Sequence, residues 1–424
     1  MVDSLNFPDS ELKTFAFRVV RKLDAAGFEA VWAGGCVRDA LRGFVPKDYD
    51  VATSARPEEV IQLFGREKTV GVGASFGVIV VLGKCKSDGQ VEVATFRSDG
   101  KYTDGRRPNH VEFCSAEKDA QRRDFTINGM FYDPLAEKMV DYVGGRQDLE
   151  RSIIRAIGNP VERFEEDKLR MLRAVRFAAR FEFALDDRTA EAVRRRAADL
   201  TQVSEERISQ ELRQMLAHSS RHLALELLRN LNLFSVVFPE VSDEAENTVL
   251  RLVPFLRLPV FEPTLAMLLQ ERLDTDFDRH RERIKRIASV LRQLRFSNEE
   301  VSTICWLCDA CDRCQSPTDL PLHRLKPILA DHRHPLLLDL IEAQVRAGLR
   351  PQSDADFLNR YLSQTTSESL DPPPLISGAD LKLLGMKDGP EFSAVLRTIR
   401  NEQLDELIST WQEAVDRVIS LREK

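Results

Sequence analysis

Two aspartates separated by one residue, Asp48 and Asp50, are the side chains of this sequence most suited to chemistry. In a β-strand, residues i and i+2 point to the same face, so the two carboxylates lie side by side. They repel each other unless a cation lies between them. Carboxylate oxygens suit Mg²⁺, and Mg²⁺ suits phosphoryl transfer. Glu92, inside the otherwise apolar run 91–96, offers a third carboxylate, which is costly there unless it is paired or bound to a metal.

A glycine pair, Gly34 and Gly35, precedes these acids and is followed by Arg38. Two glycines between a strand and a helix let the backbone approach a phosphate closely. A helix beginning near Val37 would direct its first N–H groups at that phosphate, and Arg38 would add a fixed charge. Taken alone, the glycine pair fits a plain tight turn equally well. Together with Asp48 and Asp50 it indicates a nucleotide site.

Four segments in this order carry a resemblance to a known family. Residues 34–50 resemble the active-site signature of the DNA polymerase β nucleotidyltransferase superfamily. Residues 122–128 (RRDFTIN), 166–170 (EDKLR) and 204–212 (SEERISQEL) resemble motifs of class II CCA-adding enzymes and bacterial poly(A) polymerases. The resemblance extends from about residue 30 to residue 216. It implies transfer of nucleotides to the 3′ end of RNA.

For the reaction centre, the resemblance implies that Asp48 and Asp50 hold two Mg²⁺ ions and that Glu92 completes the catalytic site. Gly34, Gly35 and Arg38 would then bind the triphosphate of CTP or ATP. Arg123 and Asp124 would contact the ribose, where a carboxylate that accepts from the 2′-hydroxyl distinguishes an NTP from a dNTP. Without that context, the run 122–124 would be a surface charge cluster.

The resemblance also implies that side chains of the protein select the base. Asp167 would accept from the exocyclic amine of cytosine or adenine, and Arg170 would donate to the adjacent ring nitrogen, with Glu166 orienting Arg170. We expect Asp167 and Arg170 to share one face of one helix, as residues i and i+3 do. The alternative is an ordinary ion pair on a helix surface.

A basic stripe follows on the next helix. Arg173, Arg176 and Arg180 have the spacing of one helix face, and no acidic residue lies between Lys168 and Arg180. We expect this stripe to bind RNA phosphates; ion pairs with acidic neighbours are the alternative. The polar, glycine-containing residues 97–113 resemble the flexible loop that CCA-adding enzymes use for adding A, which favours an enzyme able to add the terminal A.

The fold expected is α+β: a polymerase-β-like nucleotidyltransferase head, built of a mixed sheet and helices, followed by an all-α neck, body and tail. The strand patterns, at 30–33, 49–52, 78–82 and 91–96, all lie in the first 150 residues. We expect a catalytic head at 1–149, a helical neck with the base-selecting motif at 150–216, and an all-α, tRNA-binding body and tail with a degenerate HD-like region at 217–424. The last helical segment would be 378–422.

Composition sets further limits. The chain has 424 residues and a net charge of −7, which argues against a general binder of RNA. Most of the excess acid follows residue 215, away from the predicted chemistry. No apolar stretch approaches the roughly 18–20 residues that cross a bilayer, and no secretory signal precedes the first helix, so we expect a cytoplasmic protein without a membrane partner. The oligomeric state stays open.

Cys305, Cys308, Cys311 and Cys314 recur every third residue, a run that invites a metal hypothesis. If the segment is helical, four such thiols spread around the helix and cannot meet at one ion. Ser297 and Glu300 predict a capping box just before it, so we favour a helix with partly buried thiols, while a metal stays open. In the segment 263–270, which resembles an HD-bearing helix, the His-Asp pair is missing, so we expect no hydrolase activity.

The leading hypothesis is a tRNA nucleotidyltransferase that adds or repairs the 3′-terminal CCA of tRNA from CTP and ATP. Its partner would be the tRNA 3′ end. An A-adding tRNA nucleotidyltransferase and a poly(A) polymerase share nearly every motif and remain alternatives. A catalytically inactive RNA-binding protein is the alternative from another class. Intact Asp48, Asp50 and Glu92 count against it.

Overall fold

The computed structural model describes residues 5, 7–73, 77–83, 89–99, 111–270, 277–387 and 389–422. The chain forms two compact units. The first unit comprises Met1–Met215 and Leu223–Pro239, and the second comprises Leu216–His222 and Glu240–Lys424. The predicted head and neck therefore belong to one unit, which also takes in residues 223–239. The division of that unit at residue 149 stays a prediction.

A seven-stranded mixed sheet forms the head, with the strand order β3-β4-β5-β2-β1-β8-β9. Within this sheet, the β2–β5 pair is the only parallel one among the pairings described. The strands are β1 (Ala30–Ala33), β2 (Asp50–Thr53), β3 (Thr69–Gly73), β4 (Val78–Leu82), β5 (Gln90–Thr95), β8 (Phe131–Asp133) and β9 (Lys138–Val140). The sequence predicted β1 and β4 with these bounds and β2 and β5 within one residue. It missed β3, which contains glycines, and the three-residue strands β8 and β9.

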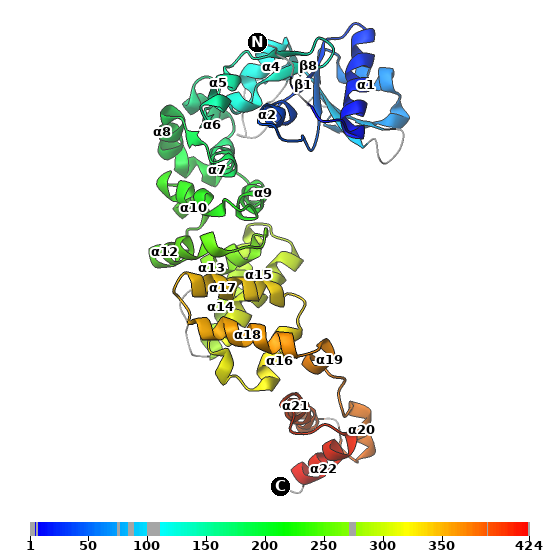
Figure 1. Cartoon of the computed structure of the whole chain (residues 1–424), viewed down its shortest axis with the longest axis vertical. Coiled ribbons are helices and arrows are strands. Elements are labelled where there is room, and N and C mark those ends of the chain that lie inside the picture. The colour runs from blue at the N-terminus through cyan, green and yellow to red at the C-terminus, as the bar shows by residue number, and fades with distance from the viewer. Residues whose placement is uncertain are drawn as a thin grey trace. The chain divides into compact units, whose positions relative to one another are not determined.

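The alternation of side chains along the strands divides the head's core into two faces. Trp32, Val51 and Val93 pack with α1 (Glu11–Ala25) on one face. Ala52 packs with α4 (Ala116–Arg122) on the other, and Figure 1 shows α1 and α4 on either side of β1 and β8. The head's helices are α1 (Glu11–Ala25), α2 (Gly35–Leu41), α3 (Pro57–Phe64), α4 (Ala116–Arg122) and α5 (Gly145–Glu150), with the 3₁₀ turns η1 (Arg66–Lys68) and η3 (Thr126–Asn128). A hairpin of β6 (Arg97–Asp99) and β7 (Val111–Phe113) stands beside the sheet.

Helices follow the head, as predicted, apart from one short parallel pair of strands, β10 (Ile153–Ile154) and β11 (Ala184–Leu185). The helices are α6 (Pro160–Glu166), α7 (Arg170–Phe181), α8 (Asp187–Arg196), α9 (Glu205–Leu216), α10 (Arg221–Asn230) and α11 (Phe234–Val237), with η4 (Ala197–Gln202). Helix α7 contributes Ala174, Phe177 and Phe181 to the core that contains the sheet. The neck is therefore anchored to the head by apolar packing.

The second unit is helical throughout its described residues. Its helices are α12 (Asp243–Leu252), α13 (Glu262–Leu269), α14 (Phe277–Gln293), α15 (Asn298–Arg313), α16 (Leu322–Ala330), α17 (His334–Arg346), α18 (Gln352–Gln364), α19 (Ser367–Leu370), α20 (Gly378–Leu383), α21 (Pro390–Leu404) and α22 (Trp411–Arg422), with η5 (Val253–Phe255) and η6 (Pro317–Asp319). The predicted segment 378–422 is three helices, α20 to α22, which share a small apolar core and lie together in Figure 1.

The cysteine run lies on α15, which begins at the predicted Ser297–Glu300 capping box. Cys308, Cys311 and Cys314 are buried, whereas Cys305 is partly exposed. Burial raises the pKa of Cys314 to about 11 and raises the pKa of Cys308 further. Both thiols are therefore protonated at neutral pH, as is usual for buried structural cysteines. The prediction of a helix with partly buried thiols is confirmed.

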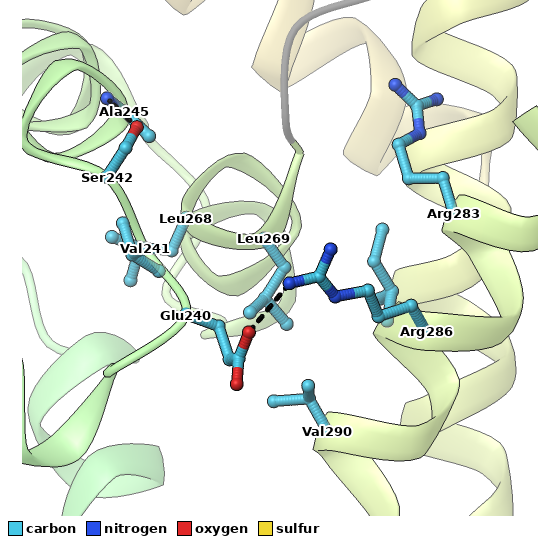
Figure 2. A pocket seen from close by; sticks show the side chains of 10 residues that line it. Glu240, Val241, Ser242, Ala245, Leu268, Leu269, Arg283, Arg286 and Val290 are labelled. Atoms are coloured by element: carbon cyan, nitrogen blue, oxygen red, sulfur yellow. Dashed lines mark hydrogen bonds and ion pairs between the residues drawn. The ribbon is translucent and has the colours of Figure 1, made fainter. Parts of the chain in front are cut away.

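A small cavity of about 30 Å³ lies in the second unit between α13, α14 and the segment that leads into α12. Figure 2 shows Glu240 and Arg286 facing each other beside it, at 2.7 Å between Oε2 and Nη2. Leu268, Leu269 and Val290 supply apolar lining. Among the described residues, no helix combines the length and the apolar character needed to cross a membrane.

Candidate nucleotidyltransferase site

Asp50 is the first residue of β2, and Asp48 stands two residues before it. Tyr49 between them is buried, whereas both aspartates are exposed, so the predicted alternation is confirmed. Val51 pairs with Val93 across the parallel β2–β5 ladder, which brings Glu92 beside Asp50. Since Val51 and Val93 face α1, the acids one residue away face the opposite side of the sheet, toward α4. The three predicted catalytic carboxylates therefore share one face.

Charge repulsion among these acids acts on Asp50. Although Asp50 keeps exposed surface, desolvation by the surrounding protein, then the charges of Asp48 and Glu92, raise the pKa of Asp50 to about 6, and Arg123 acts in the opposite direction. Within the described parts of the chain, neither Asp48 nor Asp50 accepts a hydrogen bond or forms an ion pair through its carboxylate. Two adjacent carboxylates of this kind fit a divalent cation, which removes their repulsion.

No group of three His, Cys, Asp or Glu side chains among the described residues is arranged to hold a metal ion. This includes Asp48, Asp50 and Glu92 as their side chains stand. Mg²⁺ does not require such a cage, because proteins commonly bind it through one or two carboxylates together with substrate phosphates and water. Asp48 and Asp50 meet that requirement.

The glycine pair lies directly beside the acids. Gly34 has φ +68°, a conformation that L side chains rarely adopt, and a Cβ on it would approach Arg123 Nη1 to 3.3 Å. A Cβ on Gly35 would lie 3.9 Å from Asp48 Oδ1. The predicted phosphate loop thus lies between the carboxylates and a guanidinium. Helix α2, which begins there, has only seven residues and starts at Gly35 instead of near Val37.

Arg123 is held in place by Asp119, a residue that the sequence analysis missed. Asp119 Oδ2 accepts from Arg123 Nη2 at 3.0 Å, and Asp119 Oδ1 pairs with Arg122 at 2.6 Å. The carboxylate is 2% exposed, and although its burial alone would raise the pKa of Asp119, the two guanidinium groups lower it. Its spacing of four residues from Arg123 on a helix was the available signal.

Arg38 is 6% exposed and its guanidinium has partners inside the protein. Nη1 donates to Asn128 Oδ1 at 2.5 Å, and Nε donates to Asp39 Oδ1 at 2.9 Å. The same group lies 4.7 Å from the ring centroid of Phe181 on α7. Arg38 therefore links the glycine loop to the neck helix, in addition to any contact with a phosphate.

Asp124 accepts four hydrogen bonds. Arg173 donates twice to Oδ2, and the amide of Asn128 and the backbone N–H of Phe125 donate to Oδ1. Burial alone would raise the pKa of Asp124, but the charge of Arg173 and these hydrogen bonds outweigh it and lower the pKa to about 2. Since a carboxylate has about four acceptor sites, a ribose hydroxyl must replace one of these donors.

Asp167 and Arg170, the residues predicted to select the base, do not lie on one helix, so the expectation of a shared helix is wrong. Helix α6 ends at Glu166, Asp167 is extended with φ −142°, and α7 begins at Arg170. The cause is local: Asp167 Oδ1 accepts from the N–H of Leu169 at 3.1 Å, and such a side-chain-to-backbone bond competes with helix continuation. The pairing of Glu166 with Arg170 is confirmed, at 2.8 Å between Oε2 and Nη1.

The basic stripe is mostly engaged inside the protein. Arg176 is 7% exposed and pairs with Glu211 at 2.6 Å, and Arg173 pairs with Asp124. Of the three arginines, only Arg180 is exposed. The alternative of ion pairs with acidic neighbours therefore describes Arg173 and Arg176 in this structure.

Residues 100–110 of the predicted A-addition loop lie outside the described residues. A cavity of about 660 Å³ in the second unit is lined by α13, α15 and α17, with Gln270, Asp312, Gln344 and Arg350 among its polar side chains. No predicted site residue lines that cavity. Helix α13 occupies the segment that resembles the HD-bearing helix, and the absence of hydrolase activity stays a prediction.

Two family models match the chain. Residues 30–155 match the poly A polymerase head domain, and residues 182–244 match the probable RNA and SrmB-binding site of polymerase A. The first covers the sheet with Asp48, Asp50 and Glu92. The second covers α8 to α11.

Comparisons with individual proteins agree with these matches. The CCA-adding enzyme of Enterococcus faecalis is 45% identical over 204 residues, 48% of this chain and 49% of that enzyme, and such matches span about half the length of several relatives. The CCA-adding enzyme of Lactobacillus helveticus is 32% identical over 420 residues, 99% of this chain and 98% of that enzyme. The solved structure of the Bacillus stearothermophilus CCA-adding enzyme in complex with CTP is 27% identical, with a TM-score of 0.76 over 97% of this chain and 98% of that chain.

The paired carboxylates beside a glycine loop, the mixed sheet followed by helices and an alignment over nearly the whole length all agree: this chain belongs to the CCA-adding enzyme family.

Proposed function

We propose that this chain is a tRNA nucleotidyltransferase that adds or repairs the 3′-terminal CCA of tRNA, taking CTP and ATP without a nucleic-acid template. The observation that carries the proposal is the placement of Asp48 and Asp50 beside Gly34 and Gly35, with Arg123 opposite. Relatives along the whole chain are CCA-adding enzymes, and a related structure holds CTP.

In this proposal Asp48 and Asp50 hold two Mg²⁺ ions, and Glu92 completes the acidic face of the sheet. Mg²⁺ bound there would lower the pKa of the attacking 3′-hydroxyl and neutralise charge at the α-phosphate. The 3′-oxygen of the RNA forms a bond to the α-phosphorus, and pyrophosphate leaves. The exposed, unpaired state of both aspartates supports this role.

Gly34, Gly35, Arg38 and Arg123 would hold the triphosphate. The position of Arg123 beside Gly34 favours a contact with phosphate over the ribose contact suggested by its motif. Asp119 fixes Arg123, so this charge is already oriented when the nucleotide arrives. Asp124 remains the candidate for the ribose 2′-hydroxyl.

Asp167 and Arg170 would read the base, with Glu166 fixing Arg170. Asp167 would accept from the exocyclic amine of cytosine or adenine, whereas uracil and guanine carry a keto oxygen at the corresponding position. Arg180 would contact tRNA phosphates from the solvent side, and Arg173 and Arg176 would support the site from inside. A cytoplasmic location, suitable for tRNA processing, is part of the proposal.

The test uses three tRNA substrates, ending at the discriminator base, at C or at CC, each with labelled CTP or ATP and Mg²⁺. Incorporation of two C and then one A supports the proposal. Incorporation of A alone, on the substrate ending in CC, identifies an A-adding enzyme. Continued addition of A identifies a poly(A) polymerase, and no incorporation of either nucleotide points to an inactive RNA-binding protein.

A further inference from the structure

Helix α9 supplies a cation to the base-selecting group from 40 residues farther along the chain. Arg207 Nη1 lies 3.0 Å from Asp167 Oδ1, and Arg207 Nη2 lies 2.8 Å from Asp167 Oδ2. The two side chains are 18% and 15% exposed. A bidentate pair of this kind fixes the plane of the carboxylate as well as its position.

A third donor also forms a hydrogen bond to the Asp167 carboxylate. The backbone N–H of Leu169 donates to Asp167 Oδ1 at 3.1 Å, so Oδ1 has two donors and Oδ2 has one. An ionised carboxylate has about four acceptor sites, two on each oxygen. One acceptor site therefore remains, and it lies on Oδ2.

The partner in base recognition is fixed in a similar way. Arg170 Nη1 donates to Glu166 Oε2 at 2.8 Å, and Arg170 Nη2 donates to the carbonyl of Arg122 at 3.1 Å. Asp167 is extended and follows the end of α6, whereas Arg170 begins α7, so no shared helix fixes their relative positions. Their mutual orientation depends on these outside partners.

We propose that Arg207 is a positioning residue that sets nucleotide selectivity, because it restricts Asp167 to one acceptor site on Oδ2. One N–H of an exocyclic amine, as in cytosine and adenine, satisfies that site. A keto oxygen, as in uracil and guanine, meets a second acceptor that cannot rotate away. This inference rests on the proposed function and on the assignment of Asp167 to the base.

Without Arg207, the carboxylate of Asp167 keeps its hydrogen bond from Leu169 but can rotate about the Cβ–Cγ bond. A rotated carboxylate admits water between itself and a keto base, so the rejection of uracil weakens. Cytosine loses a pre-oriented acceptor at the same time. Selectivity, and not only the overall rate, is therefore the quantity that depends on Arg207.

The experiment measures kcat/KM of the full chain for CTP and UTP on tRNA that lacks its CCA end, with Mg²⁺. We expect Arg207→Gln to lower the CTP-to-UTP ratio by about tenfold or more, the discrimination of one good hydrogen-bonded pair. The ratio for Arg207→Lys should lie between those of the unmodified chain and Arg207→Gln, because a lysine keeps the positive charge but cannot offer two parallel N–H donors to the carboxylate. Arg195→Gln is the matched control, since Arg195 is exposed on α8 and pairs within its own helix; it should leave the ratio unchanged.

A merely structural role predicts a different pattern, which overturns the inference. In that case Arg207→Gln lowers kcat/KM for CTP and UTP by the same factor and leaves their ratio unchanged. A double-mutant cycle adds a second criterion: in an Asp167→Ala background, Arg207→Gln should change the ratio no further. An equal change in both backgrounds contradicts action through Asp167.

Thermal unfolding of each variant identifies those that do not fold. If Arg207→Gln is not folded, Arg207→Lys decides, and an unchanged ratio in that variant contradicts the proposal. Failure of the unmodified chain to add CTP to tRNA overturns the proposed function itself. Normal CCA addition with an unchanged ratio in the Arg207 variants overturns only the inference about Arg207.

Discussion

Arg173 Nη2 lies 2.6 Å from Asp124 Oδ2, and Arg173 Nε lies 2.9 Å from the same oxygen. The pair joins the first turn of α7 to the segment after α4, 49 residues earlier, so it connects the neck to the head at the candidate nucleotide site. Arg173 also lies 3.8 Å from Glu211 on α9. A chain of charges thus connects three segments around one candidate ribose contact.

Asp124→Asn should destabilise the protein at neutral pH and reduce its sensitivity to acid. The pKa of Asp124 is lowered to about 2 from 3.8, so its contribution is present above the unfolded value and is lost as the pH falls through about 2. At 1.36 kcal/mol per pKa unit the contribution is about 2 kcal/mol. Urea unfolding at pH 7, 4 and 3 measures it. Asp187→Asn, which changes an exposed carboxylate on α8, is the control and should lose as much stability between pH 7 and pH 3 as the unmodified protein. If Asp124→Asn also loses as much as the unmodified protein, the role assigned to Asp124 is contradicted.

Asp48→Asn should abolish nucleotide addition while leaving the fold intact. The side chain is exposed and has no partner among the described residues, so its charge contributes little to stability. If it holds Mg²⁺, the loss removes several kcal/mol of transition-state stabilisation, or at least about 100-fold in kcat. Single-turnover incorporation of CTP measures this, with Asp187→Asn as control. An active, folded Asp48→Asn variant rules out the metal role.

Glu211→Ala should be strongly destabilising, because it leaves Arg176 buried without its partner. The side chains of Arg176 and Glu211 are 8% and 6% exposed. Removing one member of a buried pair costs about 3–5 kcal/mol. The midpoint of denaturant unfolding gives the value. Glu191→Ala removes an exposed carboxylate that pairs with Arg195, and its unfolding midpoint should not move.

Arg180→Ala should weaken tRNA binding without an effect on stability. Arg180 is the exposed member of the basic stripe, so it is the one free to neutralise a phosphate. Loss of one phosphate contact reduces the slope of log K against log salt by about 1. Binding of tRNA at several KCl concentrations measures this slope. A slope identical to that of the unmodified chain means that Arg180 does not touch the RNA.

Gly145→Ala should destabilise the head through a backbone collision. A Cβ at this position would lie 2.2 Å from the carbonyl oxygen of Thr126 in η3 and 2.7 Å from Met130 Cγ. Overpacking of this kind costs about 1–3 kcal/mol, and more where backbone must move. Gly389→Ala is the matched control, since a Cβ there meets nothing within 4 Å. Equal unfolding temperatures of the two variants would contradict the close approach.

Local patterns in the sequence predicted the elements that carry the candidate site residues. The strands β1 and β4 follow β-rich runs bounded by turn residues, and Asp48 and Asp50 flank a buried tyrosine as strand periodicity requires. The helical cysteine run follows from a capping box and helix geometry. In each case the deciding interactions lie within a few residues along the chain.

The partners of the site residues were not predictable in the same way. Nothing local in Asp167 indicates that Arg207 holds it, or that Arg176 is turned inward to Glu211 rather than outward to RNA. The prediction of a single helix for Asp167 and Arg170 is wrong because the Asp167 side chain accepts a hydrogen bond from the N–H of Leu169, which ends α6.

The sequence by itself determined the composition of the candidate site, because residue type and spacing are sufficient to place two carboxylates beside a glycine turn. Only the tertiary structure decided which charged groups face solvent and which support the site. That choice depends on contacts between segments 35 to 49 residues apart, and the burial of each pair selects its partner through the cost of leaving a charge unpaired away from water.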